Sequence, residues 1–181
     1  MTDRRDRNRG GFNNPFRDHF QDRFPNQGHG SGDSQKREKS LEDVWKDYLK
    51  NGYFDENGNL REELVKRENL QNLAKEMANA KPKPLSSNQL RRFFQHCRVI
   101  ESRILSKNSS WEREKTEFMK LDVAAADAYG KQEKKIPKIF HDFIEQNVAA
   151  VKTEKDFMCG FIKHFEALVG FASRYLDKER R

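Results

Sequence analysis

Residues 85–105 read LSSNQLRRFFQHCRVIESRIL and carry the clearest helix signal in the chain. Ser86 and Gln89 have the spacing of a capping box, and Leu85 and Leu90 flank the box at the hydrophobic-staple positions. Apolar side chains then recur at helical spacing. They are Leu90, Phe93, Phe94, Cys97, Ile100, Ile104 and Leu105. The pattern predicts a long amphipathic helix whose apolar side lies in a core.

Similar helix signals recur along the chain, and no segment shows the sustained alternation of apolar and polar residues that is typical of strands. Ser40 is expected to cap a helix that ends at Gly52, and a turn follows at residues 53–59. Four more helices are expected at about 67–79, from Ser109 to Tyr129, from Pro137 onward, and from a cap at Thr153. The predicted fold class is all-α, a compact bundle of five to six helices.

The first 39 residues differ from the rest in composition. They hold nine basic and six acidic residues, and their apolar side chains are Met1, Phe12, Phe16, Phe20 and Phe24. Such a segment buries too little apolar surface to offset its chain entropy. We therefore predict a disordered Arg-, Gly- and Asn-rich basic tail at residues 1–39 and a helical domain at residues 40–181. Three roles stay open for the tail: binding single-stranded RNA, folding on a partner protein, or remaining solvated.

The overall composition favours few function classes. The chain has 36 Lys and Arg against 29 Asp and Glu, a net charge of +7. This suits a nucleic-acid partner, although an ordinary basic protein has the same balance. No apolar run reaches about 18 residues, so no membrane contact is predicted, and no signal peptide is visible. Cys97 and Cys159 are predicted to be buried thiols in a reducing compartment, the cytoplasm.

Four arginines lie on the long helix. Helical geometry places Arg91 and Arg98 together on its flank and Arg92 and Arg103 together on its back. The helix has one carboxylate, Glu101, which falls in the apolar stripe and is expected to pair with an arginine of another helix or another subunit. Arginines without a neutralising acid suit phosphate contacts. A plain solvated face would carry the same residues.

Signals of catalysis are weak. The chain has no Gly-rich phosphate loop, and its five histidines form no pair at metal-binding spacing. His141 and Asp142 are adjacent, as in the dyad of metal-dependent phosphohydrolases, but no second histidine cluster supports them. Residues 55–60 resemble the middle of a calcium loop, yet Tyr53 and Leu64 would occupy its first and last ligand positions. The sequence predicts no catalytic residue, no metal and no cofactor.

Several stretches resemble the small helical subunit of type III-A CRISPR effector complexes, the Csm complexes. The residues that carry the resemblance are YFDENGNL at 53–60, LSSNQLRRFF at 85–94, AYGK at 128–131 and the apolar pattern from Phe157 to Val169. Their order along the chain is informative, and the block at 86–94 is the most specific of them. The resemblance extends from about Tyr53 to Leu176.

The resemblance implies a non-catalytic RNA-binding protein that stacks in several copies as a filament, beside the backbone and large subunits of the complex. Basic side chains would contact the backbones of the guide RNA and the target RNA, and cleavage would belong to other subunits. We expect this RNA face to contain Arg91, Arg92, Arg98 and Lys131. Lys131 stands where the family usually has arginine, which removes a bidentate fork, and Gly130 replaces the usual alanine. The tail has no counterpart.

Two rival interpretations follow from the residues. The first is a helical protein–protein adaptor whose phenylalanine-spaced tail docks on a partner without any RNA role. Its binding would respond much less to salt than binding through several phosphates. The second is a metal-dependent phosphohydrolase built on His141 and Asp142, which predicts bound metal and activity in the purified protein.

Overall fold

The computed structural model describes residues 37–176, and helical segments account for most of this part. The segments are α1 (Leu41–Val44), η1 (Glu62–Leu64), α2 (Arg67–Ala78), α3 (Ser87–Leu105), α4 (Trp111–Gly130), α5 (Lys138–Ala150), η2 (Asp156–Phe161) and α6 (Ile162–Ala172). Between residues 37 and 176 there is no strand, only an isolated antiparallel bridge between Phe54 and Leu60. The predicted all-α fold is therefore confirmed. No helix in this part is long and apolar enough to cross a membrane.

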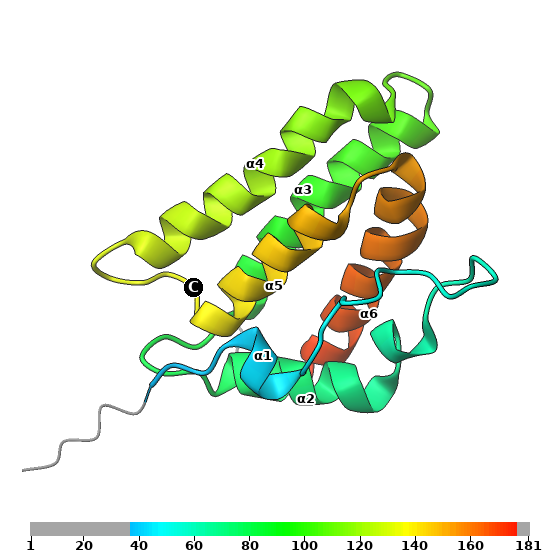
Figure 1. Cartoon of the computed structure of the whole chain (residues 1–181). Helices are drawn as coiled ribbons and strands as arrows, with labels where there is room; N and C mark the ends of the chain where they lie inside the picture. Colours follow the sequence, from blue (N-terminus) through cyan, green and yellow to red (C-terminus); the bar gives the residue numbers. More distant parts are fainter. Residues whose placement is uncertain (1–36, 177–181) are drawn as a thin grey trace, which may run out of the picture. The chain divides into compact units, whose positions relative to one another are not determined.

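The long helices pack around an aromatic core. In Figure 1, α3, α4 and α5 run side by side, and α2 crosses near one end of the bundle. α3 contacts both α4 and α6, and α2 contacts α6. Six phenylalanine rings from α4, α5, η2 and α6 are fully buried. They are Phe118, Phe140, Phe143, Phe157, Phe161 and Phe165. Their burial joins the C-terminal helices to the α3–α4 pair.

Three predicted helix caps are confirmed. The Ser86 hydroxyl accepts the Gln89 N–H at 3.3 Å, and Gln89 Oε1 accepts the Ser86 N–H at 2.9 Å. Ser40 and Asp43 form the same reciprocal pair at α1. Thr153 Oγ1 likewise accepts the Asp156 N–H at 3.1 Å at the start of the last helical segment. Each pair satisfies backbone donors that a helix start leaves unpaired.

The predicted helix from Ser40 to Gly52 is wrong in length. α1 ends at Val44, and Asp47 and Leu49 then adopt positive φ angles of 56° and 54°. The resulting turns direct the Tyr48 ring into the core, where it is buried. Burial of this ring and the hydrogen bonds of its hydroxyl compensate for the lost helical turns.

Three smaller predictions are also wrong. α4 begins at Trp111, later than predicted, because Ser109 still belongs to the turn that ends α3, where its N–H bonds to the Arg103 carbonyl. The N-cap residue of α4, Ser110, makes no side-chain cap. Leu105 is 67% exposed, since it is the last residue of α3. Cys159 is exposed because it lies in η2, a π-helical turn that directs its flanking phenylalanines inward instead. Cys97 is buried as predicted, and burial raises the pKa of its thiol.

The predicted disorder of the tail and its four phenylalanines fall on residues 1–36, outside the described part of the chain. Residues 37–39 belong to the described part and contact the helical body. Glu38 accepts a hydrogen bond from Lys134 at 2.5 Å, and Lys39 pairs with Glu76 at 2.7 Å. The hydrogen bond to Glu38 raises the pKa of Lys134.

A buried polar network joins the α1 region to α5 and α6. The Tyr48 hydroxyl donates to His164 Nε2 at 2.6 Å and accepts from Asn147 Nδ2 at 2.7 Å. The other imidazole nitrogen, Nδ1, donates to the Leu64 carbonyl. Tyr53 donates to Asn147 Oδ1 at 2.8 Å. Because every one of these polar groups has a partner, the network avoids the cost of buried unpaired groups.

Candidate nucleic-acid interface

A groove of about 600 Å³ lies between the N-terminal half of α3 and the C-terminal half of α4. Its floor is apolar, and its rim carries four cations and one carboxylate, that of Asp127. The floor residues are Phe93, Leu121, Ala124, Ala128 and Ile136. The rim cations are Arg92, Lys120, Lys131 and Lys135. This hollow contains two of the residues predicted from the sequence to contact RNA, Arg92 and Lys131.

The capping box of α3 also shapes one end of this groove. While Gln89 Oε1 caps α3, its Nε2 donates to the Lys135 carbonyl at 2.5 Å. The Lys135 N–H in turn donates to the Ala128 carbonyl at 2.8 Å. These two bonds hold the α4–α5 loop against both helices. The loop thereby places the side chains of Lys131 and Lys135 at the end of the groove.

The structure divides the four predicted RNA-contacting residues into two pairs. Arg92 and Lys131 both line the groove. The Arg98 guanidinium lies 5.9 Å from the ring centre of Phe94, and Phe94 packs against Phe165 of α6. Arg98 therefore lies on the flank of α3 that faces α6. Helical geometry places Arg91 on the same flank.

The expectation that the α3 arginines lack neutralising acids is wrong for two of them. Arg98 pairs with Glu101 of its own helix at 2.5 Å, so Glu101 does not pair with another helix. Arg103 pairs with Glu114 of α4 at 3.3 Å. Both carboxylates are buried and hold their arginines against the bundle. Within residues 37–176, Arg91 and Arg92 have no carboxylate partner.

The groove lysines have acidic neighbours at the surface. Lys131 pairs with Asp127 at 2.7 Å, and Lys120 pairs with Glu117 at 2.6 Å. The hydrogen bond from Lys120 lowers the pKa of Glu117. The lysine side chains are 52% and 63% exposed, so solvent screens these pairs and each contributes little stability. A phosphate can therefore replace either carboxylate at small cost.

A second hollow of about 370 Å³ continues the groove along α3. It shares Arg92 and His96 with the first and extends to Arg103. From Asn88 to Arg103 the two hollows follow α3 for roughly 22 Å at 1.5 Å per residue. This continuous surface is long enough for several nucleotides.

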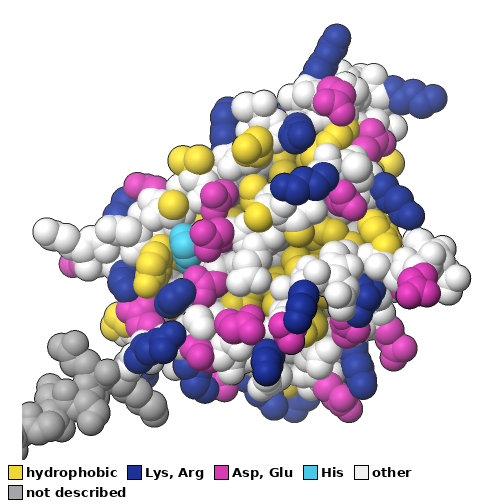
Figure 2. Space-filling view, in the orientation of Figure 1, with side chains coloured by type: hydrophobic (Ala, Val, Ile, Leu, Met, Phe, Trp, Pro, Cys, Tyr) yellow, Lys and Arg dark blue, Asp and Glu magenta, His cyan; other side chains and the backbone are white. Residues whose placement is uncertain are grey.

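Sequence reasoning missed Lys120, Lys135 and His96 as groove residues. A usable signal was present, because Lys120, Ala124, Ala128 and Lys131 recur at helical spacing on one face of α4. The contribution of Lys135 depends on the fold of the α4–α5 loop, which a periodic pattern does not report. Unlike the groove rim, which carries mostly cations, the face shown in Figure 2 has acidic and basic side chains interspersed over it.

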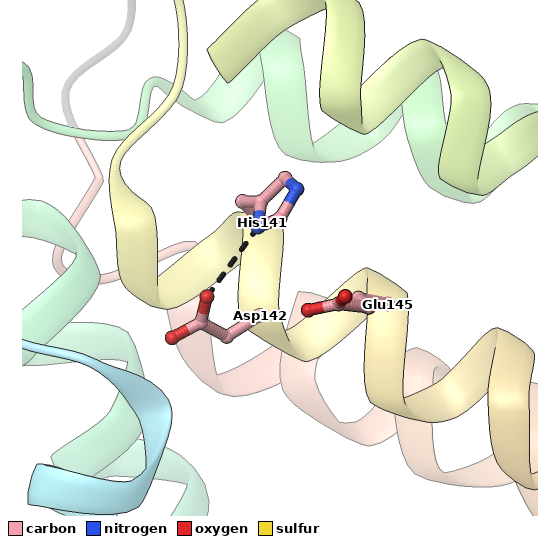
Figure 3. Close-up of side chains that lie close together, drawn as sticks. All are labelled: His141, Asp142 and Glu145. Carbon is pink, nitrogen blue, oxygen red and sulfur yellow. Dashed lines mark hydrogen bonds and ion pairs between the residues drawn. The ribbon is translucent and has the colours of Figure 1, made fainter. Parts of the chain in front are cut away.

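Asp142, which follows His141 in the sequence, has a structural role. His141, Asp142 and Glu145 together offer three ligand atoms within 4.8 Å of one another, and Figure 3 shows all three on α5. However, Lys138 Nζ lies 2.7 Å from both Asp142 oxygens, and Asp142 also accepts the Leu41 N–H at 3.1 Å. A metal ion would have to displace this ammonium group. The Asp142 carboxylate therefore serves to neutralise Lys138 and to cap α1.

These observations define a small helical-bundle protein with a basic groove between two neighbouring helices. A protein-family model described as Csm2 Type III-A matches residues 65–178, which is more than half of the chain. The chain belongs to this family, the small subunits of type III-A CRISPR Csm complexes. The match includes all four predicted RNA-contacting residues. No curated protein and no solved structure shows a significant match.

Proposed function

We propose that this chain is a non-catalytic subunit that stacks in several copies along the guide and target RNA of a cytoplasmic type III-A complex. It contacts the RNA backbone without reading its sequence, and it contacts the backbone and large subunits and copies of itself. Arg91, Arg92, Arg98 and Lys131 make the RNA contacts. The observation that carries the proposal is the basic groove within the part of the chain that matches the family model.

The charge arrangement supports phosphate binding. Arg92 has no carboxylate partner in the described part of the chain, and Lys131 has only an exposed one. The guanidinium of Arg92 offers a rigid fork of donors that matches the geometry of a phosphate. Arg91 on the other flank, about 100° around α3, adds a positive charge, and the exposed Arg98 beside it is paired with Glu101. A helix with basic residues on both flanks suits a ligand that has two backbones.

Removal of two arginines tests the proposal. We expect the double variant Arg91→Ala/Arg92→Ala to bind RNA about a hundredfold more weakly, because each charge-assisted contact contributes about 1.5 kcal/mol. Its slope of log affinity against log salt should also decrease by about 1.5. Fluorescence anisotropy with a labelled RNA duplex, from low to physiological salt, measures both quantities. Circular dichroism should show unchanged helix content.

A charge-matched variant is the control. Lys46→Ala/Lys152→Ala removes two exposed cations that lie outside the groove and have no ion-pair partner among residues 37–176. This control should keep the affinity and the salt slope of the original protein. Equal losses of RNA affinity in both double variants would mean that binding depends only on the net charge of the protein, which would contradict the assigned residues. An unchanged affinity in the arginine variant would also contradict the proposal.

A further inference from the structure

We propose that the α3–α4 groove holds one unstacked nucleobase of the bound RNA strand, with the adjoining phosphates on the basic rim. This inference rests on the function proposed above and deepens it. It adds a base-stacking site to a protein that otherwise contacts only the backbone. The site is sequence-tolerant, because stacking uses the face of a base rather than its hydrogen-bonding edge.

The floor of the groove has the chemistry of a stacking surface. Phe93 is half-buried, and its ring is held edge-on by Phe140 at a centroid distance of 5.1 Å. Opposite it on α4, Ala124 is exposed and Ala128 is half-buried, so their methyl groups leave room for a flat ring. A nucleobase that enters here covers apolar surface that is otherwise exposed to water.

The rim suits the phosphates of the same nucleotide and its neighbours. Arg92 lies on the α3 side, while Lys120 and Lys131 lie on the α4 side and at the loop end. The two lysines are positioned by carboxylates that lie three and four residues away on α4. An apolar floor with cations on both sides is complementary to a nucleotide. The face of the base lies on the floor, and the backbone phosphates, each with one negative charge, lie at the cations.

Two polar side chains beside the floor, Gln89 and His96, are already engaged within the protein. Both polar atoms of the Gln89 amide are already used, one by the Ser86 N–H and the other by the Lys135 carbonyl. His96 Nε2 is bonded to the Glu117 carbonyl at 3.1 Å. With these two groups occupied, discrimination between bases should be modest and follow stacking strength.

The dimensions favour a base over the apolar face of a partner helix. The groove volume of about 600 Å³ falls in the range of small-ligand sites. Leu121, the other α4 residue of the floor, is buried, so the accessible α4 floor extends from Ala124 to Ala128, about one helical turn or 6 Å. A docked helix needs anchor positions spread over two turns, at i, i+3, i+4 and i+7. One turn of floor accommodates a single ring.

Filling the groove without changing its charge tests the inference. The probes are a single-stranded oligoadenylate RNA of about 12 nucleotides and the same RNA with abasic central positions. We expect the full chain to bind the intact RNA about tenfold more tightly than the abasic RNA. Ala124→Leu should abolish this preference, because its side chain occupies the floor. Ala126→Leu places the same side chain at an exposed position of α4 outside the groove, and it should keep the preference.

The outcomes distinguish this inference from the proposed function. Steep salt dependence with equal affinity for intact and abasic RNA would leave backbone binding intact and overturn the stacking site. The same preference in Ala124→Leu and Ala126→Leu would also overturn it, and would leave the groove to a partner protein. Absence of any salt-dependent RNA binding would refute the proposed function itself.

Discussion

Two regions of the protein differ in how their polar groups are paired. One is the buried network of Tyr48, Asn147 and His164, and the other is the α3–α4 groove. In the network, each polar group is bonded to another group of the chain and is closed to water. In the groove, Arg92 has no carboxylate partner within residues 37–176. Lys120 and Lys131, whose own side chains are exposed, pair with the half-buried Glu117 and the exposed Asp127. Burial makes the network's bonds costly to break, whereas exposure makes the groove's bonds easy to exchange.

This contrast separates a structural role from a binding role. Fully satisfied buried groups fix the position of one segment on another and have no capacity left for a ligand. Exposed cations that are held on rigid helices keep that capacity. By the same criterion, Asp142 of α5 has a structural role, because its carboxylate already accepts hydrogen bonds from Lys138 and from the Leu41 N–H.

The largest expected effect comes from substituting asparagine by leucine in each region. Asn147→Leu leaves the Tyr48 and Tyr53 hydroxyls with fewer partners and the Phe143 carbonyl without its side-chain bond, so we expect a loss of about 4 kcal/mol. Asn88→Leu changes an exposed groove residue and should alter stability by less than about 0.5 kcal/mol. Urea unfolding measures the free energy of unfolding of both variants. Equal losses would contradict the claim that only the network's polar groups support the fold.

Acidification should weaken the network through His164. Burial lowers the pKa of its imidazole from 6.5 to about 4. Between these pH values the unfolded chain binds a proton that the folded chain does not. The free energy of unfolding therefore decreases by up to about 3 kcal/mol as the pH is lowered through this range. Urea unfolding from pH 7 to pH 4.5 measures the fall. In His164→Gln the pH dependence should be smaller by one proton, and identical slopes would contradict the assigned cause.

A smaller effect is expected where Tyr53 packs on the π-helical turn. A Cβ atom at Gly160 would lie 2.6 Å from Tyr53 Cγ, so Gly160→Ala should destabilise the fold by about 2 kcal/mol. Gly170 has no atom within 4 Å of the corresponding position, and Gly170→Ala should stabilise α6 by about 0.5 kcal/mol or more. Thermal unfolding of the two variants gives the signs. A stabilising Gly160→Ala would show that Tyr53 is loosely packed.

Local chemistry predicted the helix starts better than the surfaces that the helices form. The Ser86–Gln89 box is visible because its interactions span only three residues. The end of α1 was not predictable, since Tyr48 leaves the helix for partners about 100 residues away. The same limit applies to the groove. The sequence predicts Arg92 and Lys131 as RNA contacts on two separate segments, but their common groove depends on the packing of α4 against α3.

The partners of the arginines show the same limit. Arg98 and Glu101 are three residues apart, so their ion pair was within reach of helical geometry. The pairing of Arg103 with Glu114 crosses from α3 to α4 and needed the fold. Arg91 and Arg92 can be distinguished as the α3 arginines without a carboxylate partner among residues 37–176 only when both of these pairs are known.

Photo-crosslinking would locate the RNA on the protein most directly. The full chain is bound to a 4-thiouridine RNA at low salt, irradiated, digested, and analysed by mass spectrometry for peptides that carry a nucleotide. We expect crosslinks in the peptides that contain Phe93 and His96 and in those between Lys120 and Lys135. Crosslinks confined to α2, α6 or residues 1–36 would contradict the claim that the α3–α4 groove binds RNA.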